Sequence, residues 1–339
     1  MSTQTEPLLS VRGLHTHFPL DEGTVIAVDG ASFDLYPGQT LGIVGESGCG
    51  KSVTARSILR ILDQPGRIVS GEIWLRRGGA HGTHDIVDLA QLDPDGQTMR
   101  TVRGGEIALV FQEPMTSFSP VHSIGNQIIE AIQLHRAVSR RAARDMAIDL
   151  LHQVGIPLPE QRIDAYAFQL SGGLRQRAMI AMALSCRPSL LIADEPTTAL
   201  DVTTQAQILD LMRTLQRELG MAIMLITHDL GVIAEMADHV AVMYLGQVVE
   251  SAPVDDIFHA PKHPYTQALL QSIPRMQTTT RERLASIMGS VPHPYARPAG
   301  CLFHPRCTAF TAGVCDQREP ALQMVAANHH VSCFLHGEG

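Results

Sequence analysis

A glycine-rich loop between a strand and a helix constrains this chain more than any other feature. Residues 45–52 read Gly-Glu-Ser-Gly-Cys-Gly-Lys-Ser, which matches G-x-x-x-x-G-K-[ST], the P-loop pattern whose backbone N–H groups surround the phosphates of a nucleotide. The apolar run Thr40–Val44 before it predicts a short buried strand, and residues 52–62 predict a helix whose N-terminus points at the phosphates. A chance match would lack this context, so we expect a nucleotide-binding α/β core.

The loop residues can be given individual roles. Lys51 would reach the β- and γ-phosphates, and the Ser52 hydroxyl would bind Mg²⁺. The full set of expected contacts in this segment is Gly45, Glu46, Ser47, Gly48, Cys49, Gly50, Lys51, Ser52 and Val53.

Two adjacent acids follow a second apolar strand. Residues 190–193 are Leu-Leu-Ile-Ala, and Asp194 and Glu195 come directly after them. Asp194 would bind the metal, and Glu195 would face the attacking water. Adjacent acids after a strand can also form a solvated turn, but the upstream P-loop favours the functional interpretation.

Length and composition exclude several classes. The chain has 339 residues, 45% of them hydrophobic and 18% charged, which is typical of a folded globular protein of about two domains. A formal net charge of −8 argues against a nucleic-acid surface. The sequence shows neither a signal peptide nor the run of about 18–20 apolar residues that spans a bilayer. We therefore expect a cytoplasmic chain that reaches a membrane only through partners.

The remaining pattern alternates strands and helices, with a helical block inside. Strands are predicted at residues 107–111 and 222–226, and a hairpin at 239–252 that turns at 245–247. Residues 123–169 are predicted to be helical. Within this block, residues 140–154 are predicted to form one helix whose apolar side chains lie on a single face. The polar, glycine-rich residues 76–105 are predicted to be surface loop with some short structure.

Further motifs carry a family resemblance over residues 8–252. Residues 170–174, Leu-Ser-Gly-Gly-Leu, resemble the signature loop of the ABC (ATP-binding cassette) ATPases, although Leu174 replaces the commonest Gln. Gln112 matches the Q-loop, Asp201 the D-loop and His228 the switch histidine of that family. The resemblance implies that Glu195, His228 and Gln112 are catalytic and that Gln112 also senses Mg²⁺.

The resemblance also implies a fold and an assembly. The fold would be α/β: a P-loop NTPase (RecA-like) ABC ATPase core at residues 8–259, with an antiparallel β subdomain and an inserted helical subdomain at about 113–186. The signature residues Ser171, Gly172 and Gly173, with Asp201, would contact the ATP held by a partner subunit. Phe18 would stack on the adenine, or else belong to the core.

Four of the six cysteines lie in the last 39 residues, at Cys301, Cys307, Cys315 and Cys333. Four cysteines in a cytoplasmic chain suggest a metal site, and both zinc and an iron–sulfur cluster accept four thiolates. The spacing C-x5-C-x7-C-x17-C lacks the paired knuckles common in zinc sites. Cys49 and Cys186 are interpreted as small fillers, and His329 and His330 as surface residues.

Residues 260–339 resemble the C-terminal extension of dipeptide and oligopeptide permease ATPases, above all their D-type subunits. The matching residues are Lys-His-Pro-Tyr-Thr at 262–266, Gly-Cys at 300–301 and Pro-Arg-Cys at 305–307. This resemblance implies a [4Fe–4S] cluster on the four cysteines. Zinc, or thiols that stay reduced or are adventitiously oxidised, are the alternatives.

The leading hypothesis is an ATPase subunit that drives peptide import from the cytoplasmic face of the cell (inner) membrane. Its partners would be a second, similar ATPase, two transmembrane permease subunits and, indirectly, an external peptide-binding protein, without nucleic acid. The alternatives are an importer ATPase for nickel, a sugar or another small solute, and a soluble ABC ATPase acting on nucleic acid or ribosomes.

Overall fold

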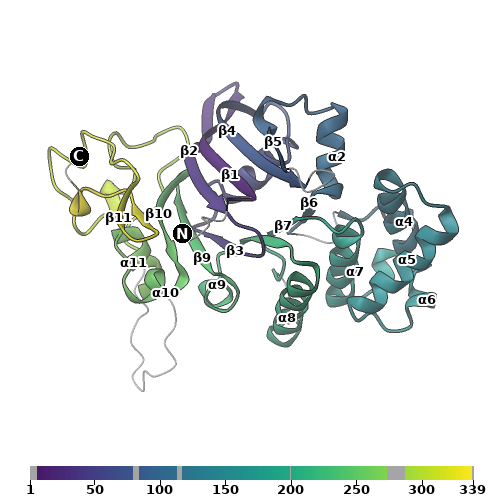
Figure 1. The fold of residues 1–339 in the computed structure, drawn as a ribbon. Coiled ribbons are helices and arrows are strands. Elements are labelled where there is room, and N and C mark those ends of the chain that lie inside the picture. Colours follow the sequence, from purple (N-terminus) through teal and green to yellow (C-terminus); the bar gives the residue numbers. More distant parts are fainter. Residues whose placement is uncertain (1–5, 79–83, 113–116, 199, 273–286, 338–339) are drawn as a thin grey trace, which may run out of the picture.

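The chain is built on a mixed eight-stranded sheet. A computed structural model describes residues 6–78, 84–112, 117–198, 200–272 and 287–337. The strand order is β11-β12-β10-β9-β3-β8-β7-β6 (Figure 1), where β9, β3, β8, β7 and β6 are parallel and β10, β12 and β11 continue the sheet in antiparallel fashion. The strands are β3 (Thr40–Val44), β6 (Ile107–Val110), β7 (Leu190–Asp194), β8 (Ala222–Ile226), β9 (His239–Tyr244), β10 (Gln247–Pro253), β11 (Gln323–Ala326) and β12 (His329–Val331).

The central strands are apolar throughout because both faces of the sheet are covered. Along β7, Leu190 and Ile192 belong to one buried cluster, whereas Leu191 and Ala193 belong to the other. This alternation follows from the two-residue period of a strand. The predicted strands and the hairpin of β9 and β10 are confirmed, and the hairpin turns at Leu245 and Gly246, which both have positive φ.

A second, antiparallel sheet covers one face. Its order is β2-β1-β4-β5, and helix α1 (Lys51–Ile58) packs between this sheet and β7 of the large one. The strands are β1 (Leu9–Leu20), β2 (Gly23–Leu35), β4 (Arg67–Gly78) and β5 (His84–Asp88). Helix α1 ends before the predicted residue 62 because Arg60 has a positive φ of 55°.

The prediction of surface loop with some short structure at residues 76–105 underestimated the regular structure of this segment. Strand β4 continues to Gly78, β5 pairs with it, and helix α2 (Gln97–Gly105) follows a 3-10 turn at Leu89–Gln91. Strand β5 has only two neighbouring apolar residues, Ile86 and Val87, and so offers no period that could be recognised.

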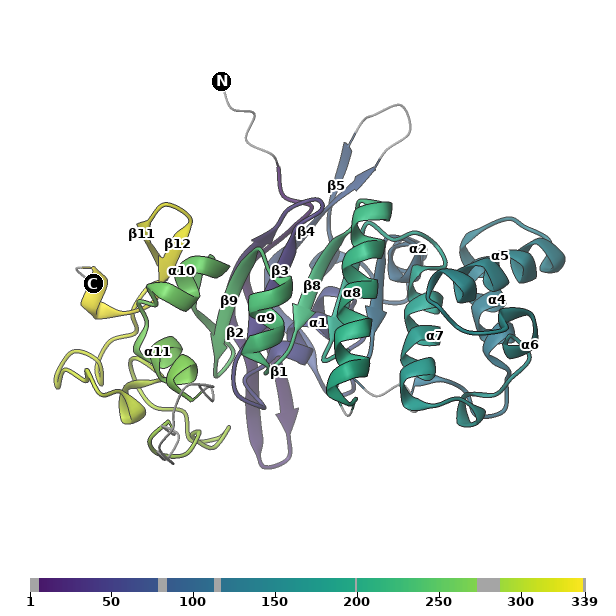
Figure 2. The same ribbon diagram turned by 90° about the horizontal axis from the view of Figure 1, so that it is seen from below.

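Helices cover the other face and one end of the molecule. Helices α7 (Gly172–Leu184), α8 (Val202–Leu219) and α9 (Leu230–Met236) pack on the face opposite α1, and α4, α5 and α6 extend beyond β6 (Figures 1 and 2). Serine side chains cap three of them: Ser123 caps α4 (Ile124–His135), Ser139 caps α5 (Arg140–Gln153) and Ser171 caps α7. Helix α6 spans Pro159–Arg162, and a 3-10 turn spans Ala167–Gln169. The predicted helical block is confirmed.

The C-terminal segment lies at the opposite end and is joined to the core by hydrogen bonds. It contains α10 (Val254–His259), α11 (Pro264–Gln271), two 3-10 turns (His304–Arg306 and Phe334–His336) and the β11–β12 hairpin, which pairs with β10. Glu250 of β10 is fully buried and accepts hydrogen bonds from the N–H groups of Lys262 (2.6 Å) and His263 (3.0 Å).

The interpretation of His329 as a surface residue was wrong. Its side chain is 2% exposed, and Nε2 lies 2.7 Å from Oε1 of the buried Glu250. A buried carboxylate needs partners for its oxygens, and His329 is one of them.

Candidate nucleotide site

The P-loop folds as predicted, between the end of β3 and the start of α1. Two glycines in it admit no side chain. A Cβ on Gly45 would lie 2.2 Å from the Met243 carbonyl oxygen, and one on Gly50 would lie 2.2 Å from that of Ala27. Both residues have positive φ, at 155° and 100°, which glycine adopts without strain. The neighbouring strands therefore fix the loop that is expected to hold phosphates.

Lys51 lies over its own loop. The side chain is buried, and Nζ donates to the carbonyl oxygens of Gly45 (2.7 Å) and Glu46 (3.1 Å). The Cys49 sulfur lies 3.8 Å from the same nitrogen. Burial raises the pKa of the Cys49 thiol, so this group is neutral and acts as a filler under the lysine. The ammonium thus lies at the loop, where it can meet an incoming phosphate.

The Ser52 hydroxyl and the Asp194 carboxylate face each other across the sheet edge. Ser52 Oγ donates to Asp194 Oδ1 at 3.0 Å. Burial raises the pKa of Asp194, the Ser52 hydrogen bond opposes this, and the neighbouring Glu195 adds to it. A cation would reverse that trend by favouring the charged carboxylate. These two oxygen ligands suit Mg²⁺, which prefers hard oxygen donors.

The Glu195 carboxylate joins the remaining predicted catalytic residues. Gln112 Nε2 and Thr198 Oγ1 each donate to Oε2 at 2.9 Å, and His228 Nδ1 lies 3.2 Å from Oε1. Burial acts to raise the pKa of Glu195, but the hydrogen bonds from His228 and Thr198 hold it below its ordinary value. The carboxylate is therefore ionised at neutral pH and can accept a proton or orient a water molecule.

The backbone supports this placement. Glu195 has a positive φ of 47°, and its N–H donates to the Ile226 carbonyl oxygen at 2.8 Å. Five predicted residues are thus connected by direct contacts or sequence adjacency: Gln112, Ser52, Asp194, Glu195 and His228. Residues 113–116, the rest of the predicted Q-loop, lie outside the described residues. Thr198 was not predicted, because a threonine three residues after the acid has no pattern of its own.

The signature and D-loop residues form a separate group. Ser171 Oγ accepts from the Leu174 N–H at 3.4 Å, and Asp201 accepts from both the N–H and the hydroxyl of Thr204. A Cβ on Gly173 would meet Thr204 at 2.7 Å, and one on Gly172 would lie 3.7 Å from Leu200. Within the described part of the chain, no hydrogen bond joins this group to the P-loop. Ala199 of the predicted D-loop lies outside that part.

Phe18 and Val53 are the two remaining residues of the predicted site. Phe18 is half-buried on β1, opposite Val25 of β2, and its ring packs against the backbone at Gly66, where a Cβ would lie 2.4 Å from Cε1. Val53 is half-buried in α1 and packs against the core between the two sheets. The adenine-stacking role of Phe18 stays a prediction.

Two residues of the C-terminal segment reach the P-loop, a contact that was not predicted. The Tyr265 hydroxyl accepts from the Glu46 N–H at 2.9 Å, and the Arg306 guanidinium donates to both carboxylate oxygens of Glu46, at 2.6 and 3.0 Å. Both lie in motifs that carried the resemblance of the extension, but the motifs do not reveal what they contact.

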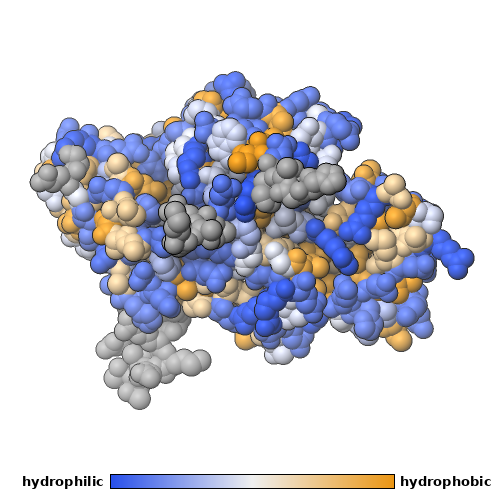
Figure 3. Space-filling model, viewed as in Figure 1, coloured by the Kyte–Doolittle hydropathy of each residue, from blue (hydrophilic) through white to orange (hydrophobic). Residues whose placement is uncertain are grey.

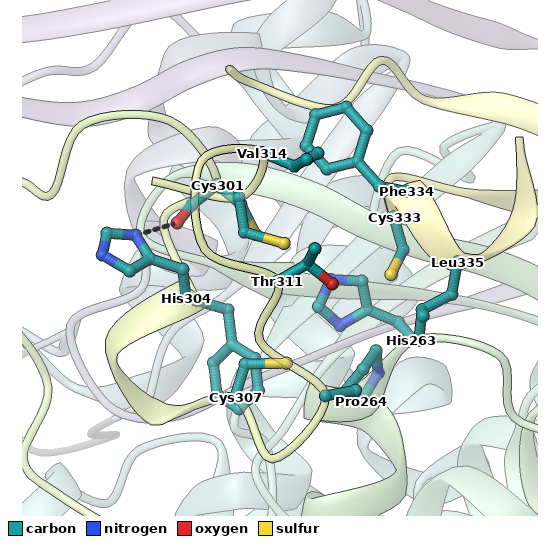
Figure 4. Close-up of a pocket in the computed structure, with 13 residues that line it drawn as sticks. His263, Pro264, Cys301, His304, Cys307, Thr311, Val314, Cys333, Phe334 and Leu335 are labelled. Atoms are coloured by element: carbon teal, nitrogen blue, oxygen red, sulfur yellow. Dashed lines mark hydrogen bonds between the residues drawn. The ribbon is translucent and has the colours of Figure 1, made fainter. Parts of the chain in front are cut away.

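The four C-terminal cysteines line one cavity of about 240 Å³, together with Phe303, Phe334 and His263. Figure 4 shows the sulfur atoms of Cys301, Cys307 and Cys333 directed toward this space. Burial raises the pKa of Cys301 to about 11 and also raises that of Cys307 and Cys333. These three groups are therefore neutral thiols at neutral pH.

The prediction of an iron–sulfur cluster was wrong. Among the described residues, which include all four cysteines, no three His, Cys, Asp or Glu side chains form a group that could hold a metal ion. The same finding leaves the zinc alternative without support. The four cysteines share a cavity, but their side chains are not grouped as the ligands of one metal ion would be.

Comparison with known proteins decides the family. The model described as "ABC transporter" matches residues 28–198, and the model described as "Oligopeptide/dipeptide transporter, C-terminal region" matches residues 249–315. The chain belongs to the ATP-binding proteins of the ABC transporters. Membership makes it an ATPase that binds ATP, pairs with another ATP-binding subunit and works with membrane subunits.

Two relatives match over nearly the whole chain. The dipeptide transport ATP-binding protein DppD of Escherichia coli (strain K12) is 48% identical over 326 residues, which cover 96% of each chain. The protein of the same name from Haemophilus influenzae is 47% identical over 324 residues, covering 96% of this chain and 92% of its own.

Solved structures confirm the fold class. CbiO1 from Clostridium perfringens, part of an ABC transporter complex, has a TM-score of 0.60 and 26% identity, and the match covers 75% of this chain and 92% of that one. A dimeric cassette, MJ0796 bound to ADP and Pi, has a TM-score of 0.63 and 24% identity, and covers 73% and 98%.

Proposed function

We propose that this chain is the ATP-hydrolysing subunit of an importer for di- and oligopeptides. The observation that carries the proposal is full-length identity of 48% to a dipeptide transport ATP-binding protein. The match to an oligopeptide/dipeptide transporter C-terminal region supports the same cargo, because it lies outside the general ATPase core.

The chemistry would be phosphoryl transfer to water. Lys51 and the P-loop N–H groups would hold the phosphates, and Ser52, Asp194 and Gln112 would hold Mg²⁺. Bound Mg²⁺ would neutralise charge on the phosphates. The ionised Glu195 would orient the attacking water, with His228 and Thr198 fixing its carboxylate at 3.2 and 2.9 Å.

Each site would be completed by a second subunit. No described hydrogen bond joins the P-loop to the signature and D-loop residues of the same chain, which are Ser171, Gly172, Gly173 and Asp201. These residues would instead contact the ATP bound by a partner. We infer a non-identical ATPase partner, two permease subunits and, beyond them, an external peptide-binding protein. Phe18 would stack on the adenine from the edge of the antiparallel sheet.

The helical subdomain, at about residues 113–186, offers a surface for the membrane subunits. Apolar side chains gather on the surface formed by α4 to α7 (Figure 3), where Leu134, Leu158 and Phe168 are 74%, 60% and 61% exposed. None of the described helices combines the length and apolar content needed to cross a bilayer. We propose that the ATPase domain, residues 8–259, and the extension, 260–339, act at the cytoplasmic face of the inner membrane through such docking.

Affinity purification from native membranes tests the proposal. The tagged chain is expected to recover two membrane permeases and a second ATPase, and its deletion is expected to abolish uptake of a labelled dipeptide. Recovery of ribosomes or nucleic acid instead would contradict it. Intact dipeptide uptake with lost nickel or sugar uptake would keep the importer and replace the cargo.

A further inference from the structure

One P-loop residue is held from outside the loop, by the C-terminal segment. Arg306 forms a bidentate ion pair with the Glu46 carboxylate, at 2.6 and 3.0 Å, and the Tyr265 hydroxyl accepts from the Glu46 N–H at 2.9 Å. Glu46 is therefore fixed at its side chain and at its backbone by residues about 220 and 260 positions away in the chain.

The guanidinium is itself rigidly placed. The Arg306 side chain is 4% exposed, its Nε donates to the Met288 carbonyl oxygen at 3.1 Å, and its charge lies 5.8 Å and 6.0 Å from the ring centres of Tyr244 and Phe303. These contacts, none of which involves the P-loop, hold the arginine side chain in one orientation. The C-terminal segment thus presents Glu46 with a guanidinium whose position does not depend on the ion pair alone.

The negative charge of Glu46 is unfavourable at a site that binds phosphates. Its carboxylate is 25% exposed, and the carbonyl oxygen of the same residue accepts from Lys51 Nζ at 3.1 Å. An unpaired carboxylate here would repel the triphosphate and compete with it for the lysine ammonium. Arg306 cancels that charge and turns the carboxylate toward the C-terminal segment.

We propose that Arg306 is a positioning residue for ATP binding: it cancels the negative charge of Glu46 beside the phosphate site and holds the P-loop in place, so that the C-terminal segment tunes ATP affinity. Tyr265 assists by fixing the Glu46 N–H. This inference rests on ATP binding at the P-loop, which belongs to the proposed function.

The molecule contains a matched control. Arg297, from the same C-terminal segment, pairs with Asp29 of β2 at 2.6 Å and donates to the Ile26 carbonyl oxygen at 3.2 Å. This second pair also ties the segment to the ATPase core, but it involves no P-loop residue. If any ion pair between the segment and the core supported ATP binding, loss of either arginine would weaken ATP affinity equally.

Isothermal titration of the purified full-length chain with Mg-ATP tests the inference. Arg306→Met is expected to weaken binding about tenfold, or about 1.4 kcal/mol. The double variant Arg306→Met/Glu46→Gln is expected to recover most of that loss, because the unpaired charge is gone. Arg297→Met is expected to bind within about twofold of the wild type.

Circular dichroism would verify folding, and Arg306→Gln, which removes the charge but keeps a polar side chain of similar reach, replaces the methionine variant if that fails to fold. Wild-type affinity in the Arg306 variant, no recovery in the double variant, or an equal loss in Arg297→Met would each overturn the inference. Absence of ATP binding by the wild-type chain would overturn the proposed function as well. If the affinity differences are found as expected but deletion of the chain leaves peptide uptake intact, only the proposed cargo is overturned.

Discussion

Two glutamate–histidine pairs in this chain have the same chemistry and opposite surroundings. Glu195 and His228 lie 3.2 Å apart with side chains 15% and 63% exposed, whereas Glu250 and His329 lie 2.7 Å apart and are 0% and 2% exposed. Both pairs follow or occupy strands of the same sheet. Their residue types alone do not distinguish them.

The difference lies in what else each carboxylate can still contact. Glu250 accepts two backbone N–H groups and the buried His329, so its oxygens are occupied by groups that do not leave. The Glu195 carboxylate accepts its described hydrogen bonds from side chains only, and the side chain of its partner His228 is largely exposed to solvent. Because the histidine partner of Glu195 is exposed, a water molecule and a phosphate can approach that carboxylate. The buried histidine partner of Glu250 instead stabilises the fold.

The largest expected effect concerns the pair Glu195 and His228, called the open pair because His228 is exposed. Glu195→Gln should lower ATP hydrolysis by about 10²–10⁴-fold in the assembled transporter, because the amide cannot take up a proton from water. ATP affinity and unfolding midpoint should stay near the wild type. Phosphate release and titration with ATP measure the two. Wild-type turnover would remove Glu195 from the chemistry and erase the contrast between the pairs.

The buried pair should respond in the opposite way. Glu250→Ala should lower the free energy of unfolding by about 3–5 kcal/mol, because it leaves His329 and two N–H groups without an acceptor. Urea unfolding followed by circular dichroism measures this. Glu235→Ala, which removes an exposed pair with Arg213, is the control and should cost about 0–1 kcal/mol. Equal losses in the two variants would show that burial is not what separates them.

A pH titration sharpens the comparison, because His263 adjoins Glu250. Burial lowers the pKa of His263 to about 3, and its Nδ1 accepts the Tyr265 N–H at 3.0 Å, which caps α11. The folded-state pKa of His263 lies below its unfolded value. The full contribution of the neutral His263 to the free energy of unfolding is therefore present above about pH 6.5 and is lost as the pH falls.

Between pH 6.5 and 4.5 this group should cost about 2–3 kcal/mol of stability. His263→Asn keeps a capping acceptor without a titrating ring, and its stability should fall less steeply over that range. His239, whose pKa burial lowers to about 4, should contribute to the slope that remains. An unchanged slope in the variant would exclude His263 as its source.

The smallest effect is expected at the signature loop. Ser171→Arg should leave the ATP affinity of the isolated chain near normal, because Ser171 contacts the start of its own helix and not the P-loop. The same variant in the assembled transporter should damage hydrolysis. Weakened ATP binding by the isolated variant would contradict the division into two half-sites.

The sequence predicted the open pair far better than the buried one. The P-loop, Asp194, Glu195 and His228 stand at fixed distances from apolar strands, so their positions follow from local pattern. Glu250 and His329 are 79 residues apart, and only the pairing of β10 with β12 brings them together. Contacts of that kind depend on topology, which a single sequence does not reveal.

The contact of Arg306 with Glu46 escaped prediction for the same reason. The cysteines illustrate the reverse error, since their number suggested a metal that their placement does not support. Strand β5 was missed because it is too short to show a period.

The β11–β12 hairpin has one more consequence, for aggregation. Strand β12 pairs with β10, which would otherwise present an unpaired row of backbone N–H and C=O groups at the edge of an apolar sheet. Such an edge is a template for the strands of other molecules. A chain shortened after residue 260 would expose it, and we expect such a chain to associate with itself even while its nucleotide loop stays folded.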